Sequence, residues 1–178
     1  AELQQQLLKD DCYIPGFDNQ DTEDLARRAA VSATSESVHG PAVNVINGVS
    51  RSVGDKTNFW ESASVGSQGE TLTLKLPEEK SLREIRLTFD TDLSHEIMPS
   101  IVREVRERQV KGMPHELVKD YRISLYSQGK KVWEKTILDN VQRLNIHPLE
   151  DIKCGEVEVT VLGTHGLERA RIYEVRIY

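Results

Sequence analysis

The alternation of apolar and polar residues with a period of two is the feature that most constrains the fold. Apolar residues recur at every second position within four segments: Leu72–Leu76, Ile85–Phe89, Val157–Val161 and Tyr173–Ile177. Successive side chains of a β-strand point to opposite faces, so each segment predicts a strand with one buried face. Many such strands with turns between them and little helix predict an all-β, antiparallel sandwich or barrel.

A β-hairpin is predicted in the second half of the chain. Ile123 and Leu125 lie in a segment that ends at the turn Ser127–Lys130, and Val132–Ile137 follows it. Two short β-favouring segments joined by a turn with glycine are typical of a hairpin.

The first thirty residues have a different pattern and are predicted to form a helical connector, residues 1–30. Leu3, Leu7 and Leu8 would share one side of a helix, which Pro15-Gly16 would end. A second helix is predicted over Thr22–Ala30, with Asp21 or Thr22 as its N-cap. The sandwich domain would then span residues 31–178.

The stretch Asp92–Asp120 interrupts the strand pattern. It places Ile101, Val102 and Val105 among several charged residues, so it is too charged for a core strand and too long for a hairpin loop. Insertions of this size in compact domains are usually functional or mobile.

Charge and cysteine content exclude several classes of function. The net charge of −6 and the pI near 5.4 argue against a nucleic-acid surface, which needs a basic stripe. No apolar run has the length of a membrane span. Cys12 and Cys154 have no second ligand at metal-binding spacing, so both are predicted to be free, buried thiols.

Three motifs together resemble the discoidin family, also called factor V/VIII C-type domains, which includes family 32 carbohydrate-binding modules. The opening Val31–Glu36 with Gly40–Gly48 is similar to the family's "A-S-S … P-A-x-N-A-I-D-G". Thr57–Ser62 is similar to "T-x-W-x-S", and Ala170–Tyr178 to "A-R-I-x-E-I-x-V-Y". The resemblance implies a jelly-roll sandwich (galactose-binding-domain-like) over residues 31–178, with both termini close together.

A narrower resemblance is to the C-terminal extensions of certain bacterial FAD-dependent oxidoreductases. It rests on four segments: Leu3–Asp11, Ile14–Gly16, Asp24–Arg27 and Leu87–Leu93. The chain has no Gly-x-Gly-x-x-Gly fingerprint, so any flavin chemistry would lie in a parent enzyme outside it. A bacterial protein, secreted or on the cell surface, is favoured over a cytoplasmic one.

The discoidin resemblance also implies a structural calcium ion between the opening loop and the last strand. The residues that match the family's ligand positions, or could replace them, are Ile46, Asn47, Asp55, Thr57 and Glu174. Calcium needs six to eight oxygen ligands. Asn47-Gly48-Val49 stands where the family often has Asp-Gly-Asp, and Asp55 could replace the missing aspartate.

Sugars in this family bind at loops at one end of the sandwich, through an aromatic ring with nearby His, Arg or Asn. The candidates in this chain are Arg51, Asn58, Phe59 and His95. Trp60 matches the family's core tryptophan, so we expect it to pack inside the sandwich rather than stack on a sugar.

The sequence offers no nucleophile beside a base. Asp90 and Asp92 could resemble paired acids, but their spacing is also typical of the start of a loop. The chain is therefore predicted to be a non-catalytic carbohydrate-binding module appended to a larger enzyme. The alternative is an accessory domain of a flavoenzyme that packs against the catalytic body, or mediates oligomerisation, without binding sugar.

Overall fold

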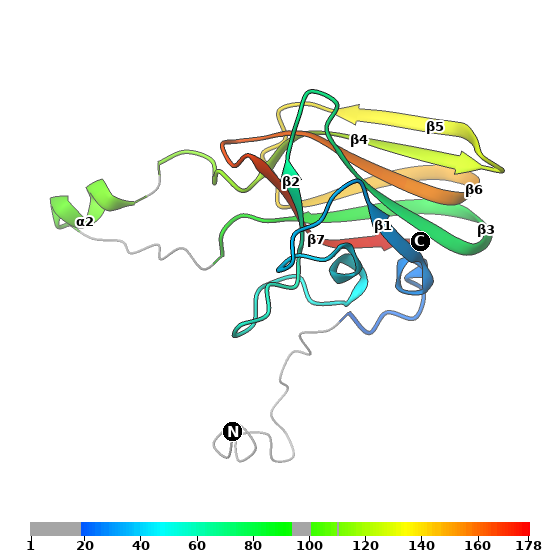
Figure 1. Cartoon of the computed structure of the whole chain (residues 1–178), viewed down its shortest axis with the longest axis horizontal. Coiled ribbons are helices and arrows are strands. Elements are labelled where there is room, and N and C mark those ends of the chain that lie inside the picture. Colours follow the sequence, from blue (N-terminus) through cyan, green and yellow to red (C-terminus); the bar gives the residue numbers. More distant parts are fainter. Residues whose placement is uncertain (1–18, 94–100, 110) are drawn as a thin grey trace, which may run out of the picture.

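The computed structural model describes residues 19–93, 101–109 and 111–178, and seven antiparallel strands dominate it (Figure 1). The strands are β1 (Ala30–Ala33), β2 (Trp60–Ser64), β3 (Glu70–Phe89), β4 (Val118–Ser127), β5 (Lys130–Ile137), β6 (Leu144–Thr164) and β7 (Arg169–Ile177). The prediction of an all-β antiparallel fold is confirmed. The helix expected around Leu3–Leu8, together with Cys12 and His95, lies outside the described residues.

Two long strands, β3 and β6, pass through both layers of the sandwich. The first part of β3 pairs with β1 and with the end of β6, and β4 and β5 continue this layer. The second part of β3 pairs with β7 and with the start of β6, and β2 pairs with β7. The register of β3 against β6 shifts between Lys75 and Lys80, where each strand leaves one layer for the other.

The predicted alternation places the core between the layers. Leu72, Leu74, Ile85, Leu87 and Phe89 are fully buried, as are Val157, Val159 and Val161. Trp60 is also fully buried, and its indole N–H donates to the carbonyl of Ser35 at 2.9 Å. The prediction that Trp60 is a core residue is confirmed.

The β4–β5 hairpin is confirmed, and its turn explains the local sequence. Gln128 and Gly129 both have positive φ, 50° and 74°. Two consecutive residues with positive φ form a turn whose twist matches that of the flanking strands.

The entry to the sandwich differs from the prediction. A single 3-10 turn, η1 (Leu25–Arg28), replaces the helix expected over Thr22–Ala30, because Ala30 already begins β1. Its cap is Asp24 and not Asp21 or Thr22. The Asp24 carboxylate accepts from the backbone N–H of Ala26 and also from that of Ile177, both at 3.0 Å. This second bond joins the start of the described chain to its last strand, which confirms that both ends of the sandwich lie close together.

Two shorter elements complete the fold. The 3-10 helix η2 (Ala42–Ile46) precedes the loop to β2, and its Ala42 and Val45 enter the core. The helix α2 (Arg103–Arg108) lies in the insertion, beside the exposed Ile101 and Val102. None of the helices in the described part of the chain is long and apolar enough to cross a membrane.

Candidate functional site

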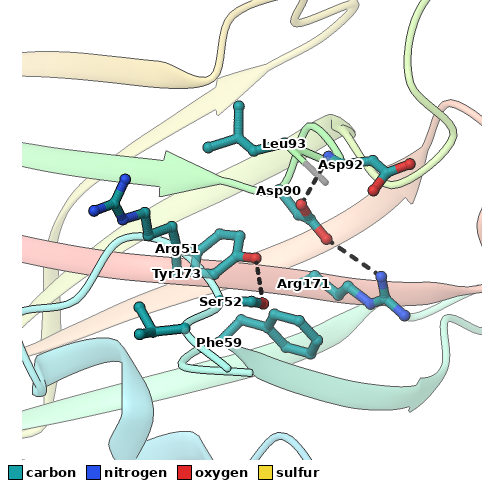
Figure 2. A pocket seen from close by; sticks show the side chains of 9 residues that line it. Arg51, Ser52, Phe59, Asp90, Asp92, Leu93, Arg171 and Tyr173 are labelled. Atoms are coloured by element: carbon teal, nitrogen blue, oxygen red, sulfur yellow. Dashed lines mark hydrogen bonds and ion pairs between the residues drawn. The ribbon is translucent and has the colours of Figure 1, made fainter. Parts of the chain in front are cut away.

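A hollow of about 400 Å³ lies where four segments meet at one end of the sandwich (Figure 2). Its walls come from the loop after η2, the residue before β2, the turn after β3, and β7. The lining residues are Arg51, Ser52, Val53, Phe59, Asp90, Asp92, Leu93, Arg171 and Tyr173.

A β-bulge in β7 gives the hollow its aromatic wall. Thr88 pairs with Glu174, but Phe89 pairs with Ile172, so Tyr173 is an extra residue between them. Bulges re-aim side chains, and here the Tyr173 ring meets the Phe59 ring edge-on, with centroids 5.4 Å apart. The Tyr173 hydroxyl lies 3.0 Å from that of Ser52, which joins β7 to the loop wall.

An ion-pair network fixes the polar wall. The Arg171 guanidinium donates to Glu61 at 2.8 Å and to Asp90 at 3.2 Å, and it lies 4.8 Å from the centre of the Phe59 ring. Arg169 donates to the other oxygen of Glu61 at 3.0 Å. Burial raises the pKa of Glu61, but hydrogen bonds from Arg171 and Arg169 and the charge of Arg171 outweigh it and lower that pKa. Glu61 therefore stays ionised and holds Arg171 in place.

The two aspartates after β3 do not form a pair of catalytic acids. One carboxylate oxygen of Asp90 accepts from the backbone N–H of Asp92 at 2.9 Å, and the other accepts from Arg171. Asp90 is 3% exposed, so its carboxylate shapes the turn and anchors the arginine. These contacts agree with the interpretation that Asp90 and Asp92 mark the start of a loop.

The structure brings two of the four candidate sugar-binding residues together. Arg51 and Phe59 both line the hollow, whereas the Asn58 side chain is buried and hydrogen-bonds within the loop. Asn58 has φ 58° and donates to the carbonyl of Arg51 at 3.0 Å. Sequence reasoning missed Ser52, Asp90, Arg171 and Tyr173. The closing motif contains Arg171 and Tyr173, but strict alternation along β7 would have turned Tyr173 into the core.

The five residues expected to hold calcium lie in η2, in the loop that follows it, and on β7. Asp55 and Thr57 line a separate, shallow hollow with His39 and Asn44. Both ends of the Asn47 amide are engaged: its oxygen accepts from Val49 N–H, and its nitrogen donates to Asn58. Ile46 ends η2 just before this amide.

Glu174, the one expected calcium ligand on β7, has an arginine partner. Its Oε2 lies 3.0 Å from Nε of Arg176, and the side chain is 4% exposed. Among the described residues, no three His, Cys, Asp or Glu side chains are grouped as a metal site. Arg176 pairs with one oxygen of Glu174, whereas the other, Oε1, is buried without a hydrogen-bond partner among the described residues. The calcium ion therefore stays a prediction.

The described cysteine, Cys154, is free and buried in the core, as predicted for it. Burial raises the pKa of its thiol to about 11. A protonated, buried thiol is unreactive, so Cys154 has a packing role.

Comparisons with known proteins identify the fold. No family model matches the chain, and no curated protein sequence matches it. Several solved structures match over nearly their whole length. A fucose-binding module of Streptococcus pneumoniae superposes with a TM-score of 0.65 at 13% identity, covering 87% of this chain and 96% of that one.

Two further structures agree. The family 32 carbohydrate-binding module of NanJ from C. perfringens, solved with galactose, gives a TM-score of 0.59 at 19% identity and covers 86% of this chain and 96% of that one. The lectin domain of lectinolysin, solved with Lewis B antigen, gives 0.64 at 13% identity, covering 89% and 97%. The chain therefore has the galactose-binding-like sandwich fold of discoidin-type modules. The fold implied by the sequence motifs is confirmed, and the flavoenzyme resemblance stays a prediction.

Proposed function

We propose that the chain is a non-catalytic carbohydrate-binding module and that its sugar binds in the hollow lined by Arg51, Phe59, Asp90, Arg171 and Tyr173. The observation that carries the proposal is the hollow itself, where fixed polar groups adjoin two aromatic rings. Carboxylate oxygens accept hydrogen bonds from sugar hydroxyls and guanidinium groups donate to them, while aromatic carbon contacts the apolar side of a sugar ring.

Preorganisation supports a role in binding. Glu61 and Asp90 hold Arg171 before any ligand arrives, so little side-chain entropy is lost when a ligand binds. The structural neighbours are described as binding fucose, galactose and Lewis B antigen, which favours a sugar over other small ligands.

A position within a larger enzyme is also proposed. The chain matches 14% of the length of a family 89 glycoside hydrolase from Clostridium perfringens, at a TM-score of 0.60 and 17% identity. A sandwich of this kind therefore occurs as one part of a long enzyme chain, and a parent catalytic domain is the partner we expect here.

Glycan-array binding tests the proposal, followed by titration calorimetry on the best ligand with Arg51→Ala. Arg51 is exposed in the loop wall, so its loss should weaken binding about tenfold, equivalent to one good charged hydrogen bond. Arg83→Ala is the matched control, since Arg83 is an exposed arginine on β3 outside the hollow. Melting temperatures of both variants show whether the fold is retained. A blank array, or equal affinities for Arg51→Ala and wild type, would overturn the proposal and favour the accessory role.

A further inference from the structure

Residues 48–58 form the loop that lines one wall of the hollow. It runs from η2 to β2, and its residues 51–56 are exposed. A small bridge between Val53 and Lys56 closes its tip. On β7, the Tyr173 hydroxyl meets Ser52 at 3.0 Å.

Arg143, just before β6, also contacts this loop. Its guanidinium donates to the carbonyl oxygen of Ser50. The same group lies 5.6 Å from the centre of the Tyr173 ring, a cation–π contact. A single half-buried cation therefore touches both the loop and the strand against which the loop packs.

The charges of two carboxylates act on this cation. Burial lowers the pKa of Arg143 most strongly, while the charges of Tyr173, Asp90 and Glu174 raise it. Within the described part of the chain, Nε of Arg143 and Oε1 of Glu174 are both buried without a hydrogen-bond partner. The Glu174 carboxylate, where calcium was expected, pairs with Arg176 and also interacts electrostatically with Arg143.

We propose that Arg143 is a positioning residue that fixes loop 48–58 on β7, and that no calcium ion is needed to hold this loop. The loop is then held by a side chain of the protein itself, so its order is independent of metal. Arg51 and Ser52 follow directly after Ser50, so the contact also sets where they stand in the hollow. Only this last consequence rests on the proposed function.

Limited trypsin digestion of the native protein tests the anchor without any sugar. Arg51 and Lys56 provide cleavage sites inside the loop, and Arg106 in the exposed helix α2 provides an internal standard. The ratio of loop cleavage to Arg106 cleavage is measured for wild type, Arg143→Met and Arg143→Lys, each in EDTA and in millimolar calcium. Arg86→Met is the matched control, because Arg86 pairs with Glu84 and lies over the Tyr178 ring without touching the loop.

Arg143→Met should raise the loop ratio about tenfold, as expected when a local contact that prevents opening is lost. Arg143→Lys should restore part of the protection, since it keeps the charge, and Arg86→Met should match wild type. The wild-type ratio should be equal in EDTA and calcium.

Unchanged protection in Arg143→Met would overturn the proposal, as would loop cleavage that EDTA increases in wild type. If Arg143→Met does not fold, Arg143→Lys carries the test, and protection equal to wild type in that variant at every trypsin concentration would overturn the proposal that the guanidinium contacts fix the loop. If wild type shows a protected loop but binds no glycan on the array, the loop-anchor proposal holds and only the sugar-binding proposal fails.

Discussion

Lowering the pH is expected to destabilise the fold through His147, a histidine buried between the two layers. His147 lies on the first part of β6 and is 5% exposed. Its Nε2 lies 2.9 Å from the hydroxyl of Tyr121 on β4, so the pair joins one layer to the other. Burial, with a smaller effect of the Lys135 charge, lowers the pKa of His147 to about 4.

The sign and size of the effect follow from proton linkage. The folded state resists protonation of His147 until about pH 4, whereas the unfolded chain binds the proton near the ordinary value of 6.5. Between these values the unfolded state holds more protons, so the free energy of unfolding falls as the pH falls. The loss attributable to His147 should reach about 2 kcal/mol between pH 7 and pH 5, and about 3 kcal/mol below pH 4.

Urea denaturation of wild type and His147→Gln at pH 7.5, 6.5, 5.5 and 4.5 measures this contribution. Surface carboxylates contribute equally to both proteins, so the difference in their pH dependence isolates His147. Tyr121→Phe is the control, because it removes the hydroxyl partner and should lower stability by about 1 kcal/mol while keeping the histidine's pH dependence. Parallel curves for wild type and His147→Gln would refute the reasoning.

Two further predictions concern Glu61 and the residues packed around it. A Cβ added at Gly40 would lie 2.6 Å from the backbone nitrogen of Glu61, so Gly40→Ala should cost about 1–3 kcal/mol in denaturant melts. Gly66→Ala, where a Cβ would meet no atom within 4 Å, should be nearly neutral, and equal losses would contradict the steric argument. Glu61→Gln should cost about 3 kcal/mol, because it leaves Arg169 and Arg171 without their shared carboxylate. A melting curve unchanged from wild type would show that this network contributes no net stability.

Most of the fold could be predicted because its strands are half-buried. Alternation alone predicts the buried side chains of Leu72, Leu74 and Ile85. The motif around Trp60 predicts that this tryptophan lies in the core. The entry to the sandwich was predicted less well. Asp24 caps η1 while also binding Ile177, and a side chain that bonds across 153 positions of sequence leaves no local signal.

The site was harder to predict, because one residue breaks the pattern that predicted the fold. Strict alternation along β7 assigns Tyr173 to the core with Val175 and Ile177. The bulge turns Tyr173 toward the hollow, where it contacts Phe59, Ser52 and Arg143 together. The extra residue is visible only in the pairing with β3, since Phe89 opposes Ile172 while Thr88 opposes Glu174. The hollow and the loop anchor therefore both depend on a register shift that no single segment of the sequence encodes.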